Sequence, residues 1–445
     1  MNITLSQGQQ FAFDQYRLGE NIFVTGPGGS GKSALIKLIV KDAVDRGKNV
    51  QVCALTGTAA VLLECNAKTV HSWGGIGLAT GERMAVANRV NKSKFKKRNW
   101  KAVDILIVDE VSMMSCKLFE ILEITARLCR KNPKPFGGIQ VIFTGDFYQL
   151  PPVGNEDEPD TCKFCFESPE WENIFTQQIQ LKTIFRQEDN DYKRILNQIR
   201  VGRITKSTVA KLNALVGRKV NSDETILPTI LYPTRRKVDS INTSSLNALK
   251  GDEYVYDFCK ADVKDLNISE ATASLLAVFS QEQKDRELQY MIDNVNFEKR
   301  LVLKEGSQVM CVANIDMDSE TPICNGSQGI VEGFDPNDKM PIVRFKNGAV
   351  RKMGLHLWQS ETIQSIGIKQ VPLILAWAIT IHKSQGASLD TAEIDVGGGI
   401  FECGQTYVAL SRIRSMEGLY LKSFDPAKII IHKKVREFYK SLEDL

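Results

Sequence analysis

Eight consecutive residues have the composition of a phosphate-binding loop. They follow the apolar run Ile22–Val24, and they are Gly26, Pro27, Gly28, Gly29, Ser30, Gly31, Lys32 and Ser33. Glycines let successive backbone N–H groups turn inward around a polyphosphate, the lysine contacts the outer phosphates, and the serine hydroxyl binds Mg²⁺. We therefore predict a nucleoside triphosphate site with Ser33 as an Mg²⁺ ligand. The alternative is an ordinary glycine-rich turn between a strand and a helix.

Two adjacent carboxylates end another predicted strand and have the chemistry of a hydrolysis site. The apolar residues Ile105–Val108 run directly into Asp109 and Glu110. A carboxylate at the end of a strand can hold Mg²⁺, and its neighbour can orient and deprotonate an attacking water. The pair favours hydrolysis, because a kinase that transfers phosphate to another substrate has no need of the second carboxylate. The alternative is a pair of solvated acids.

Three polar residues farther along the chain are candidates for sensing and stabilising the outer phosphate. Gln149 follows the strand candidate Ile139–Thr144, within the segment Gly145–Pro152. An amide at this place can sense the γ-phosphate or its loss and move the loop that follows. Arg186 and Arg412 are candidate arginine fingers, a kind of residue that contributes about 10³ to 10⁵ in rate.

The length and composition favour an intracellular protein of more than one domain. At 445 residues the chain exceeds what one hydrophobic core usually serves, so we expect two to four domains. The net charge of +4 permits an anionic partner without requiring one. The ten cysteines are scattered, as is typical of reduced thiols, and no run of about 18 apolar residues predicts a membrane span. We expect a soluble, intracellular protein of unassigned compartment, with no membrane partner.

Apolar strand candidates alternate with helical patterns along much of the chain. After a short helix at Ser6–Tyr16, strands are predicted at Ile22–Thr25, Val50–Leu55, Asp104–Val108 and Ile139–Thr144. This alternation predicts an α/β fold in which helices cover a parallel sheet. A second alternating block, from Ile230 to Lys422, predicts a second α/β lobe and includes one strand at Leu373–Thr380.

Two segments interrupt this alternation. One, at roughly Leu301–Met353, contains short apolar runs separated by glycine and asparagine and is predicted to be β-rich. The other, Gly74–Trp100, is glycine-rich at first and then basic, with the cations Lys92, Lys94, Lys96, Lys97 and Arg98. We interpret the basic run as a solvated loop, and a contact with a phosphate backbone is the alternative.

Taken together, these motifs resemble those of the Pif family of DNA helicases, in the RecD-like branch of helicase superfamily 1. The similarity covers Leu5 to about Leu421, and its most specific stretch is Arg127–Pro152. The resemblance implies two RecA-like P-loop lobes with parallel sheets. Residues 1–178 would form the first lobe, with a small strand-separating insertion at about 74–100. Residues 179–445 would form the second, with an SH3-like β insertion at about 255–358.

The resemblance also assigns site residues position by position. It implies that ATP is the nucleotide, that Gln9 reads adenine, that Gly386 belongs to the nucleotide site and that Asp109 positions Mg²⁺. The catalytic set would be Lys32, Glu110, Gln149, Arg186 and Arg412. The residues that match motifs in contact with DNA are Thr56, Gly57, His71, Ser72, Thr234, Thr380, His382 and Lys383.

The implied activity is that of an ATP-dependent DNA helicase that moves 5′ to 3′ on single-stranded DNA and unwinds duplex or structured DNA. Roles in DNA repair, recombination and telomere maintenance follow from the same resemblance. The expected partners are single-stranded and forked DNA, bound by a monomer or by a DNA-induced dimer. Three alternatives stay open: a P-loop kinase for a small molecule, a non-hydrolysing nucleotide switch or DNA-binding module, and a RecD-like subunit of a recombination nuclease complex.

Overall fold

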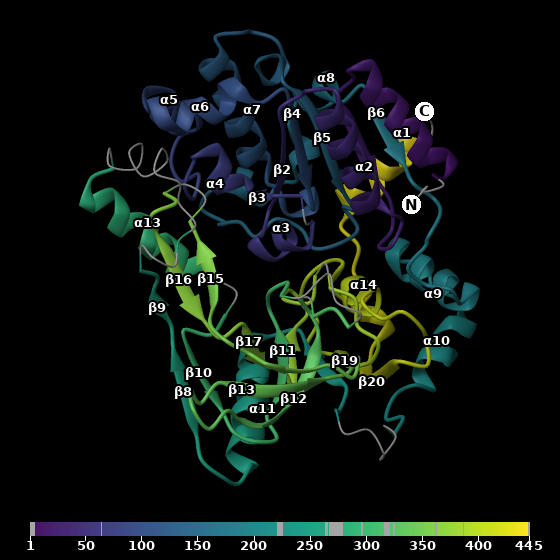
Figure 1. The fold of residues 1–445 in the computed structure, drawn as a ribbon. Helices are drawn as coiled ribbons and strands as arrows, with labels where there is room; N and C mark the ends of the chain where they lie inside the picture. Colours follow the sequence, from purple (N-terminus) through teal and green to yellow (C-terminus); the bar gives the residue numbers. More distant parts are fainter. Residues whose placement is uncertain are drawn as a thin grey trace. The chain divides into compact units, whose positions relative to one another are not determined.

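The computed structural model describes residues 5–63, 65–219, 226–262, 266, 279–294, 297–315, 321–323, 325–360, 363–385 and 387–443. The chain divides into two compact units (Figure 1). Unit 1 contains Met1–Ala214, Ile400–Glu417 and Phe424–Leu445, and unit 2 contains Leu215–Gly399 and Gly418–Ser423. The chain therefore leaves unit 1 twice, after Ala214 and after Glu417, and returns to it each time. The lobe boundary at residues 178 and 179 stays a prediction.

A six-stranded parallel sheet forms the centre of unit 1. Its strands, in the order β3-β2-β4-β5-β1-β6, are Lys68–Thr69, Val50–Ala54, Ile105–Asp109, Gln140–Gly145, Ile22–Thr25 and Gln177–Gln180. Every pairing in the sheet is parallel, so the carboxyl ends of the strands meet at one edge. The four strands predicted for this region are confirmed to within one residue at each end.

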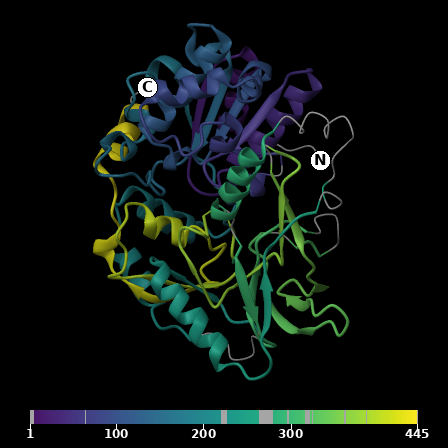
Figure 2. The same cartoon turned by 90° about the vertical axis from the view of Figure 1, so that its left-hand side faces the viewer.

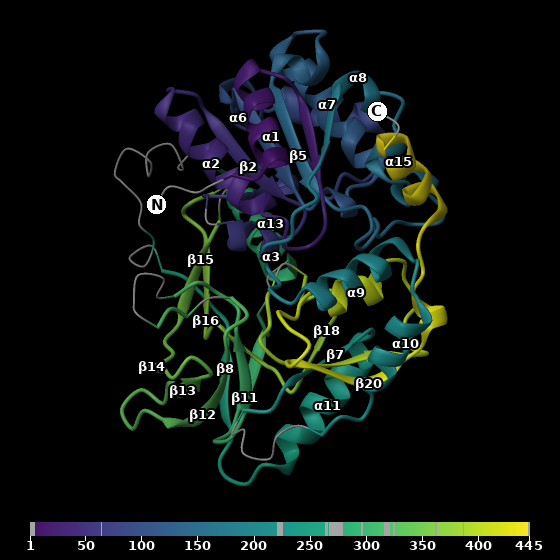
Figure 3. The ribbon, with the colours of Figure 1, turned by 90° about the vertical axis from the view of Figure 1, so that its right-hand side faces the viewer.

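Alternating side chains along these strands bury both faces of the sheet. Ile22 and Val24 face a core built with α1 (Gln7–Leu18), α2 (Lys32–Asp45) and α3 (Gly57–Leu63). Phe23, between them, faces the other way. The centre of its ring lies 5.1 Å from the ring centre of Trp171 in α8 (Trp171–Ile174). Three helices contribute aromatic side chains to this second face: α7 (Cys116–Arg130), α8 and α15 (Lys433–Glu443). These helices are labelled in Figure 3.

The basic run of the predicted insertion at 74–100 lies on helices, so the prediction of a loop was wrong, although most of its basic side chains are exposed. After α4 (Val70–Gly74), the chain forms α5 (Arg83–Lys92) and α6 (Lys94–Ala102). The Ser93 hydroxyl accepts the N–H of Lys96 and caps α6, and Trp100 in its last turn is fully buried. The helix forms because one large aromatic anchors it and a serine caps it, although most of its other residues are charged.

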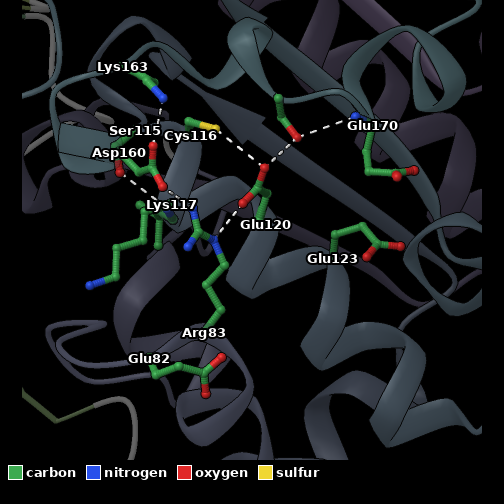
Figure 4. Close-up of polar contacts among 12 residues, drawn as sticks. Glu82, Arg83, Ser115, Cys116, Lys117, Glu120, Glu123, Asp160, Lys163 and Glu170 are labelled. Carbon is green, nitrogen blue, oxygen red and sulfur yellow. Dashed lines mark hydrogen bonds and ion pairs between the residues drawn. The ribbon is translucent and has the colours of Figure 1, made fainter. Parts of the chain in front are cut away.

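Arg83 ties the beginning of α5 to the rest of unit 1 (Figure 4). Its guanidinium donates to Glu120 on α7, and its Nη2 donates to Asp160 Oδ2 at 2.6 Å. Lys163 also donates to Asp160, at 2.8 Å. Hydrogen bonds from Lys163 and Arg83 lower the pKa of Asp160 to about 2. The insertion is thus held to α7 by charged contacts as well as by its apolar side chains.

Three further helices complete unit 1. They are α9 (Asn190–Val201), α10 (Lys206–Asn213) and α14 (Gln405–Leu410). The Tyr192 hydroxyl of α9 donates to the Leu410 carbonyl of α14 at 2.7 Å, in a fully buried contact. The segment that contains Arg412 is therefore packed against α9 within the same compact unit as the phosphate-binding loop.

Unit 2 contains a second sheet with parallel strands. Its order is β18-β7-β19-β20, and the strands are Ala378–Thr380, Thr229–Tyr232, Ala392–Val396 and Leu419–Phe424. β7 pairs in parallel with both β18 and β19. The helix α11 (Arg235–Ala248) follows β7 and packs against β7 and β18. This unit is therefore also α/β, as predicted for a second RecA-like lobe.

Unit 2 also contains antiparallel strands, drawn in teal and green in Figure 2. A five-stranded sheet has the order β14-β13-β12-β11-β17, with strands Val350–Lys352, Pro341–Phe345, Gln328–Phe334, Gln308–Cys311 and Leu373–Leu375. A three-stranded sheet joins β15 (His356–Gln359), β16 (Gly367–Gln370) and β9 (Cys259–Lys260), and a pair joins β10 (Arg300–Leu303) and β8 (Tyr254–Asp257). Among the residues of unit 2 that the structure describes, there is also the helix α13 (Gln281–Asn294).

The apolar run Leu373–Thr380, predicted as one strand, is two strands in two different sheets. β17 pairs with β11 in the antiparallel sheet, and β18 pairs with β7 in the parallel one. Between them the Asn242 side chain of α11 accepts the Ala378 N–H at 2.9 Å and donates to the Ala378 carbonyl at 3.0 Å. Both halves are buried, so the apolar pattern alone did not reveal the break.

None of the helices in the described part of the chain has both the length and the apolar character needed to cross a membrane.

Candidate functional site

The phosphate-binding loop connects β1 to α2, at the carboxyl edge of the first sheet. Gly29 and Gly31 both have φ of +81°, in the left-handed region that favours glycine. The Lys32 amino group donates to the carbonyls of Gly26 at 2.8 Å and Pro27 at 3.2 Å. The side chain of Lys32 is therefore folded back over the loop, and its amino group lies beside the loop backbone.

The surroundings of the loop fit a polyphosphate. The Ser30 hydroxyl is buried and has no hydrogen-bond partner among the described residues, and Ser33 at the start of α2 is exposed. A Cβ on Gly29 would lie 2.4 Å from the Arg186 Cβ, so the backbone and this arginine approach each other as closely as a glycine allows. Backbone N–H groups, an amino group and a guanidinium thus gather where phosphate oxygens would need donors.

The two predicted hydrolytic carboxylates lie at the end of β4. Asp109 is buried, and its Oδ1 accepts the Glu110 N–H at 2.9 Å and the Thr144 hydroxyl of β5. Glu110 has φ of +56°, a left-handed backbone that is uncommon for a residue with a side chain. The strand therefore turns sharply at this place, and Glu110 is half-buried beside the Asp109 carboxylate.

Burial and mutual charge set the ionisation of this cluster. Burial lowers the pKa of Lys32, while the negative charges of Asp146, Glu110 and Asp109 oppose that shift. Burial raises the pKa of Asp109, and the Thr144 hydroxyl, the Glu110 N–H and the charge of Lys32 oppose it. Burial thus outweighs the attraction between the lysine and the carboxylates, and both pKa values move toward the neutral forms.

Asp146 anchors a buried network that sequence reasoning missed. It is completely buried, and Arg200 of α9 donates two hydrogen bonds to its carboxylate, at 2.8 and 2.9 Å. The Tyr439 hydroxyl of α15 donates to the same carboxylate at 3.2 Å and also bonds the Thr25 hydroxyl at the end of β1. The Arg200 guanidinium lies 4.5 Å from the centre of the Tyr148 ring. This network fixes the segment that leads into Gln149.

Gln149 lies in the same buried region as the network. Its side chain is almost fully buried, and Oε1 has no hydrogen-bond partner among the described residues. A buried amide oxygen without a partner is costly, and such atoms are concentrated at functional sites. The structure therefore places an unsatisfied acceptor where a phosphate sensor was predicted.

The two candidate arginine fingers lie close together in unit 1. Arg186 donates to the Ser411 carbonyl at 3.2 Å, while Arg412 donates to the Val408 carbonyl at 2.9 Å and to the Ser411 hydroxyl at 3.0 Å. Burial and, after it, the positive charge of Arg186 lower the pKa of Arg412 to about 10, which leaves it protonated at neutral pH. Two cations this close are favourable neighbours for an anion.

Tyr407 is a second residue at this site that the sequence did not single out. Its hydroxyl is buried and accepts the Gly28 N–H of the phosphate-binding loop at 2.8 Å. Burial raises the pKa of Tyr407, so the hydroxyl stays neutral. The neutral Tyr407 oxygen thus accepts the hydrogen bond of one of the backbone N–H groups of the loop. The segment that also carries Arg412 touches the loop directly through this bond.

Gln9, the predicted adenine reader, lies next to the loop as expected. Its Nε2 donates to the Gly31 carbonyl at 3.2 Å, while its Oε1 accepts the Ser6 N–H in the cap of α1. A Cβ on Gly31 would lie 3.4 Å from Phe185, whose ring is 52% exposed. A nucleotide base beside the loop could form hydrogen bonds with the Gln9 amide and stack on the exposed Phe185 ring. Phe185 was not singled out from the sequence.

The predicted DNA-contacting residues of unit 1 follow two paired strands. Thr56 and Gly57 come after β2, and His71 and Ser72 come after β3. Ala54 and Thr69 at the ends of these strands are paired. Burial lowers the pKa of His71, so a contact with a phosphate would use a neutral imidazole. The structure therefore brings these four residues together at one edge of the sheet.

The corresponding residues of unit 2 follow β7 and β18. Thr234 is at the N-cap position of α11, without a capping bond from its side chain, and Thr380 ends β18 beside Tyr232 of β7. The Thr380 hydroxyl accepts the Lys383 N–H at 3.2 Å, so His382 and Lys383 are held in a tight turn after the strand. The remaining prediction, Gly386, lies outside the described residues.

Most aromatic side chains beside the predicted contact motifs are buried. Trp73 and Phe147 are almost fully buried and pack on other rings, with Trp73 4.6 Å from Trp100 and Phe147 5.3 Å from Phe23. Trp377 is half-buried. Trp73 and Phe147 are therefore part of the core.

Comparison with known proteins identifies the family. The model of the PIF1-like helicase family matches residues 4–210, and the model of the 2B domain of DNA helicase Pif1 matches residues 290–334. A crystal structure of Pif1 helicase from Candida albicans is 35% identical, with a TM-score of 0.80 over 99% of this chain and 100% of that one. The chain belongs to the Pif1 helicase family.

Two further Pif1 proteins extend the comparison. The ATP-dependent DNA helicase PIF1 of Danio rerio is 36% identical over 98% of this chain. A crystal structure of Pif1 helicase from Bacteroides in complex with ADP-AlF3 and single-stranded DNA is 28% identical, covers 100% of this chain and 98% of that one, and has a TM-score of 0.69. The chain spans 64% of the length of the zebrafish protein. The α/β architecture with parallel sheets predicted from the sequence is thus confirmed as that of Pif1 helicases.

Proposed function

We propose that this Pif1-family chain is a DNA helicase that hydrolyses ATP and moves 5′ to 3′ along single-stranded DNA. The observation that carries the proposal is the convergence of Lys32, Asp109, Glu110 and the two arginines on one phosphate-binding loop. Relatives with helicase names, one of them solved with ADP-AlF3 and single-stranded DNA, support the substrates. The direction of movement follows from family membership.

The residues around the loop would have different roles in the binding and hydrolysis of ATP. Lys32 and the loop N–H groups would bind the phosphates, and Ser33 with Asp109 would hold Mg²⁺. Bound Mg²⁺ neutralises charge on phosphate oxygens. Glu110, placed beside Asp109 by the sharp turn after β4, would orient the water and accept its proton. Gln9 would contact the adenine edge.

The arginines and Gln149 would couple the chemistry to movement. Arg186 and Arg412 would stabilise charge on the transferred phosphate, which is the usual task of arginine fingers. Tyr407 bonds the Gly28 N–H, so phosphate binding at this donor requires the tyrosine to give up its bond. A nucleotide would thereby displace the segment that carries Arg412. Gln149, buried with an unsatisfied oxygen, would respond to the same change.

Single-stranded DNA would be bound at the ends of the strands of both sheets. Threonine and serine hydroxyls, a neutral histidine and the Lys383 amino group supply donors for phosphates without reading the sequence of the bases. The oligomeric state, a monomer or a dimer formed on DNA, stays a prediction. So does the intracellular location.

Two measurements test this function. DNA-stimulated ATPase activity in the wild type and in Glu110→Gln should differ by at least about 10²-fold, the size typical of a lost general base. Equal rates would remove Glu110 from the catalytic set. Absence of stimulation in the wild type would favour a small-molecule kinase or a passive nucleotide switch.

The second measurement tests direction with matched duplexes that carry either a 5′ or a 3′ single-stranded tail. We expect ATP-dependent unwinding only with the 5′ tail. A preference for the 3′ tail would overturn the assigned direction, and activity only in the presence of a partner chain would favour the RecD-like alternative.

A further inference from the structure

The basic run in the insertion forms a single stripe along α6. Lys94, Lys97, Arg98 and Lys101 are spaced by three and four residues, which places them on one face of the helix. They line one shallow groove on the surface. Three of the four are exposed, and Lys97 also donates to the Asn91 side chain. We refer to these four residues as the α6 stripe.

The first turn of the stripe has an unfavourable position, although Lys101 lies in the last turn of α6, where the helix dipole favours a cation. Among the described residues, no carboxylate lies within ion-pair distance of Lys94, Arg98 or Lys101. Lys94 and Lys97 are in the first turn of α6, where the helix dipole disfavours cations. Like charges along one face also repel each other. An external anion would relieve both kinds of repulsion.

α6 is joined rigidly to the helix that carries two of the predicted DNA contacts. Trp100 donates its indole N–H to the Gly74 carbonyl of α4 at 2.9 Å, and the Asn99 amide donates to the Trp73 carbonyl at 2.9 Å. The same short helix, α4, carries His71 and Ser72. These bonds lie on the side of α6 opposite the stripe, so the stripe faces away from α4 at a fixed angle.

We infer that the α6 stripe binds the phosphate backbone of double-stranded DNA next to the single strand that the helicase holds. This inference rests on the proposed function. From Lys94 to Lys101 the helix rises about 10 Å, a length over which a duplex carries about six negative charges. Single strands are usually held by cations together with stacking rings. Trp73 and Trp100 are buried. Phe95 of α6 is 42% exposed, but it lies about 100° around the helix from Lys94, outside the stripe. The stripe itself contains no ring and suits stacked DNA whose bases are not available.

The experiment compares two fluorescent probes: a single-stranded oligonucleotide, and the same strand extended by a duplex arm. The stripe variant replaces Lys94, Lys97, Arg98 and Lys101 with alanine. The control variant replaces four exposed lysines elsewhere with alanine: Lys41, Lys48, Lys206 and Lys219. Both variants lower the formal net charge from +4 to zero. Alanine preserves helix propensity, and circular dichroism checks the fold.

We expect the duplex arm to increase affinity for the wild type and the control variant by at least tenfold at 0.1 M salt, and to add little for the stripe variant. The salt dependence of binding to the tailed duplex, expressed as the slope of log K against log [salt], should fall by about 2 to 4 in the stripe variant. A variant with arginine at the three lysine positions should bind like the wild type. Single-strand binding and single-strand-stimulated ATPase activity should be unchanged.

Three outcomes overturn the inference: no effect of the duplex arm in the wild type, equal losses in the stripe and control variants, or an equal loss on the single strand. The last would mean that the stripe holds single-stranded DNA instead. Failure of the proposed function is distinct, because the wild type would then show no ATPase stimulation by the single strand.

Discussion

Replacement of Arg200 by methionine should destabilise unit 1 strongly, because it leaves the Asp146 carboxylate buried without its cation. The side chains of Arg200 and Asp146 are 6% and 0% exposed. Removal of one partner from a buried ion pair costs about 3–5 kcal/mol. The lost stacking of the guanidinium on Tyr148 adds about 0.5–2 kcal/mol, while the remaining bonds from the Tyr148 N–H and the Tyr439 hydroxyl moderate the loss. We expect the free energy of unfolding to fall by about 3 kcal/mol in total.

Urea unfolding followed by tryptophan fluorescence measures this loss. Trp171 lies 6.0 Å from the Phe147 ring, next to Asp146, so its emission reports on this region. With a slope of about 3 kcal/mol per molar urea, the midpoint should fall by about 1 M. Arg203→Met, at an exposed arginine just after the same helix, is the matched control and should change the free energy of unfolding by less than about 0.5 kcal/mol.

A double-mutant cycle separates the ion pair from the packing of its side chains. Asp146→Asn combined with Arg200→Met should cost less than the sum of the two single changes by about 2 kcal/mol, because no buried charge is then left unpaired. If Arg200→Met has the same midpoint as Arg203→Met, or if the two single effects simply add, the reasoning from the buried pair is refuted.

Three other changes should have distinct effects. Gly29→Ala should weaken ATP binding at least tenfold in a nucleotide titration, because the new Cβ would meet the Arg186 side chain. Gly47→Ala is the control, because Gly47 has a similar φ of +69° but open space around it. It should leave ATP binding unchanged in the same titration. Asp160→Asn should lower stability by up to about 1 kcal/mol at pH 7, after allowance for solvent screening. Because the pKa of Asp160 is lowered to about 2, this difference should be present above pH 4 and disappear as the pH falls to 2 in urea titrations; a constant difference would contradict the charged contact. Trp100→Ala should cost about 3–5 kcal/mol, measured by thermal unfolding, and should reduce duplex binding; binding unchanged in a folded variant would show that α6 needs no anchor.

The nucleotide site was largely predictable because its main parts are local in sequence. A loop such as Gly26–Ser33 requires its glycines and lysine at fixed spacing, and the carboxylates of Asp109 and Glu110 directly follow an apolar strand. Parallel strands then bring these separate motifs to one edge of the sheet. The chemistry of each motif could therefore be inferred before any distance was known.

The rest of the site depends on long-range pairing that leaves no local pattern. Arg200, Tyr407 and Tyr439 lie on three helices with ordinary sequences, and only the fold shows that each contacts the loop or Asp146. The helix α6 was missed for another reason, since it has few apolar residues and its stability comes mainly from one buried side chain, Trp100. Propensity and periodicity say little about a helix held by a single anchor.

The bond between Tyr439 and Thr25 has a consequence for how the protein is made. These residues are 414 positions apart, yet their hydroxyl groups meet in the buried network at the end of β1. A ribosome that has released the whole first sheet still has more than half of the chain to add before that network can close. During this interval the nascent chain can fold strands and helices, but Asp146 and Thr25 lack the Tyr439 hydroxyl. The buried network at the end of β1 therefore closes only after α15 has been made.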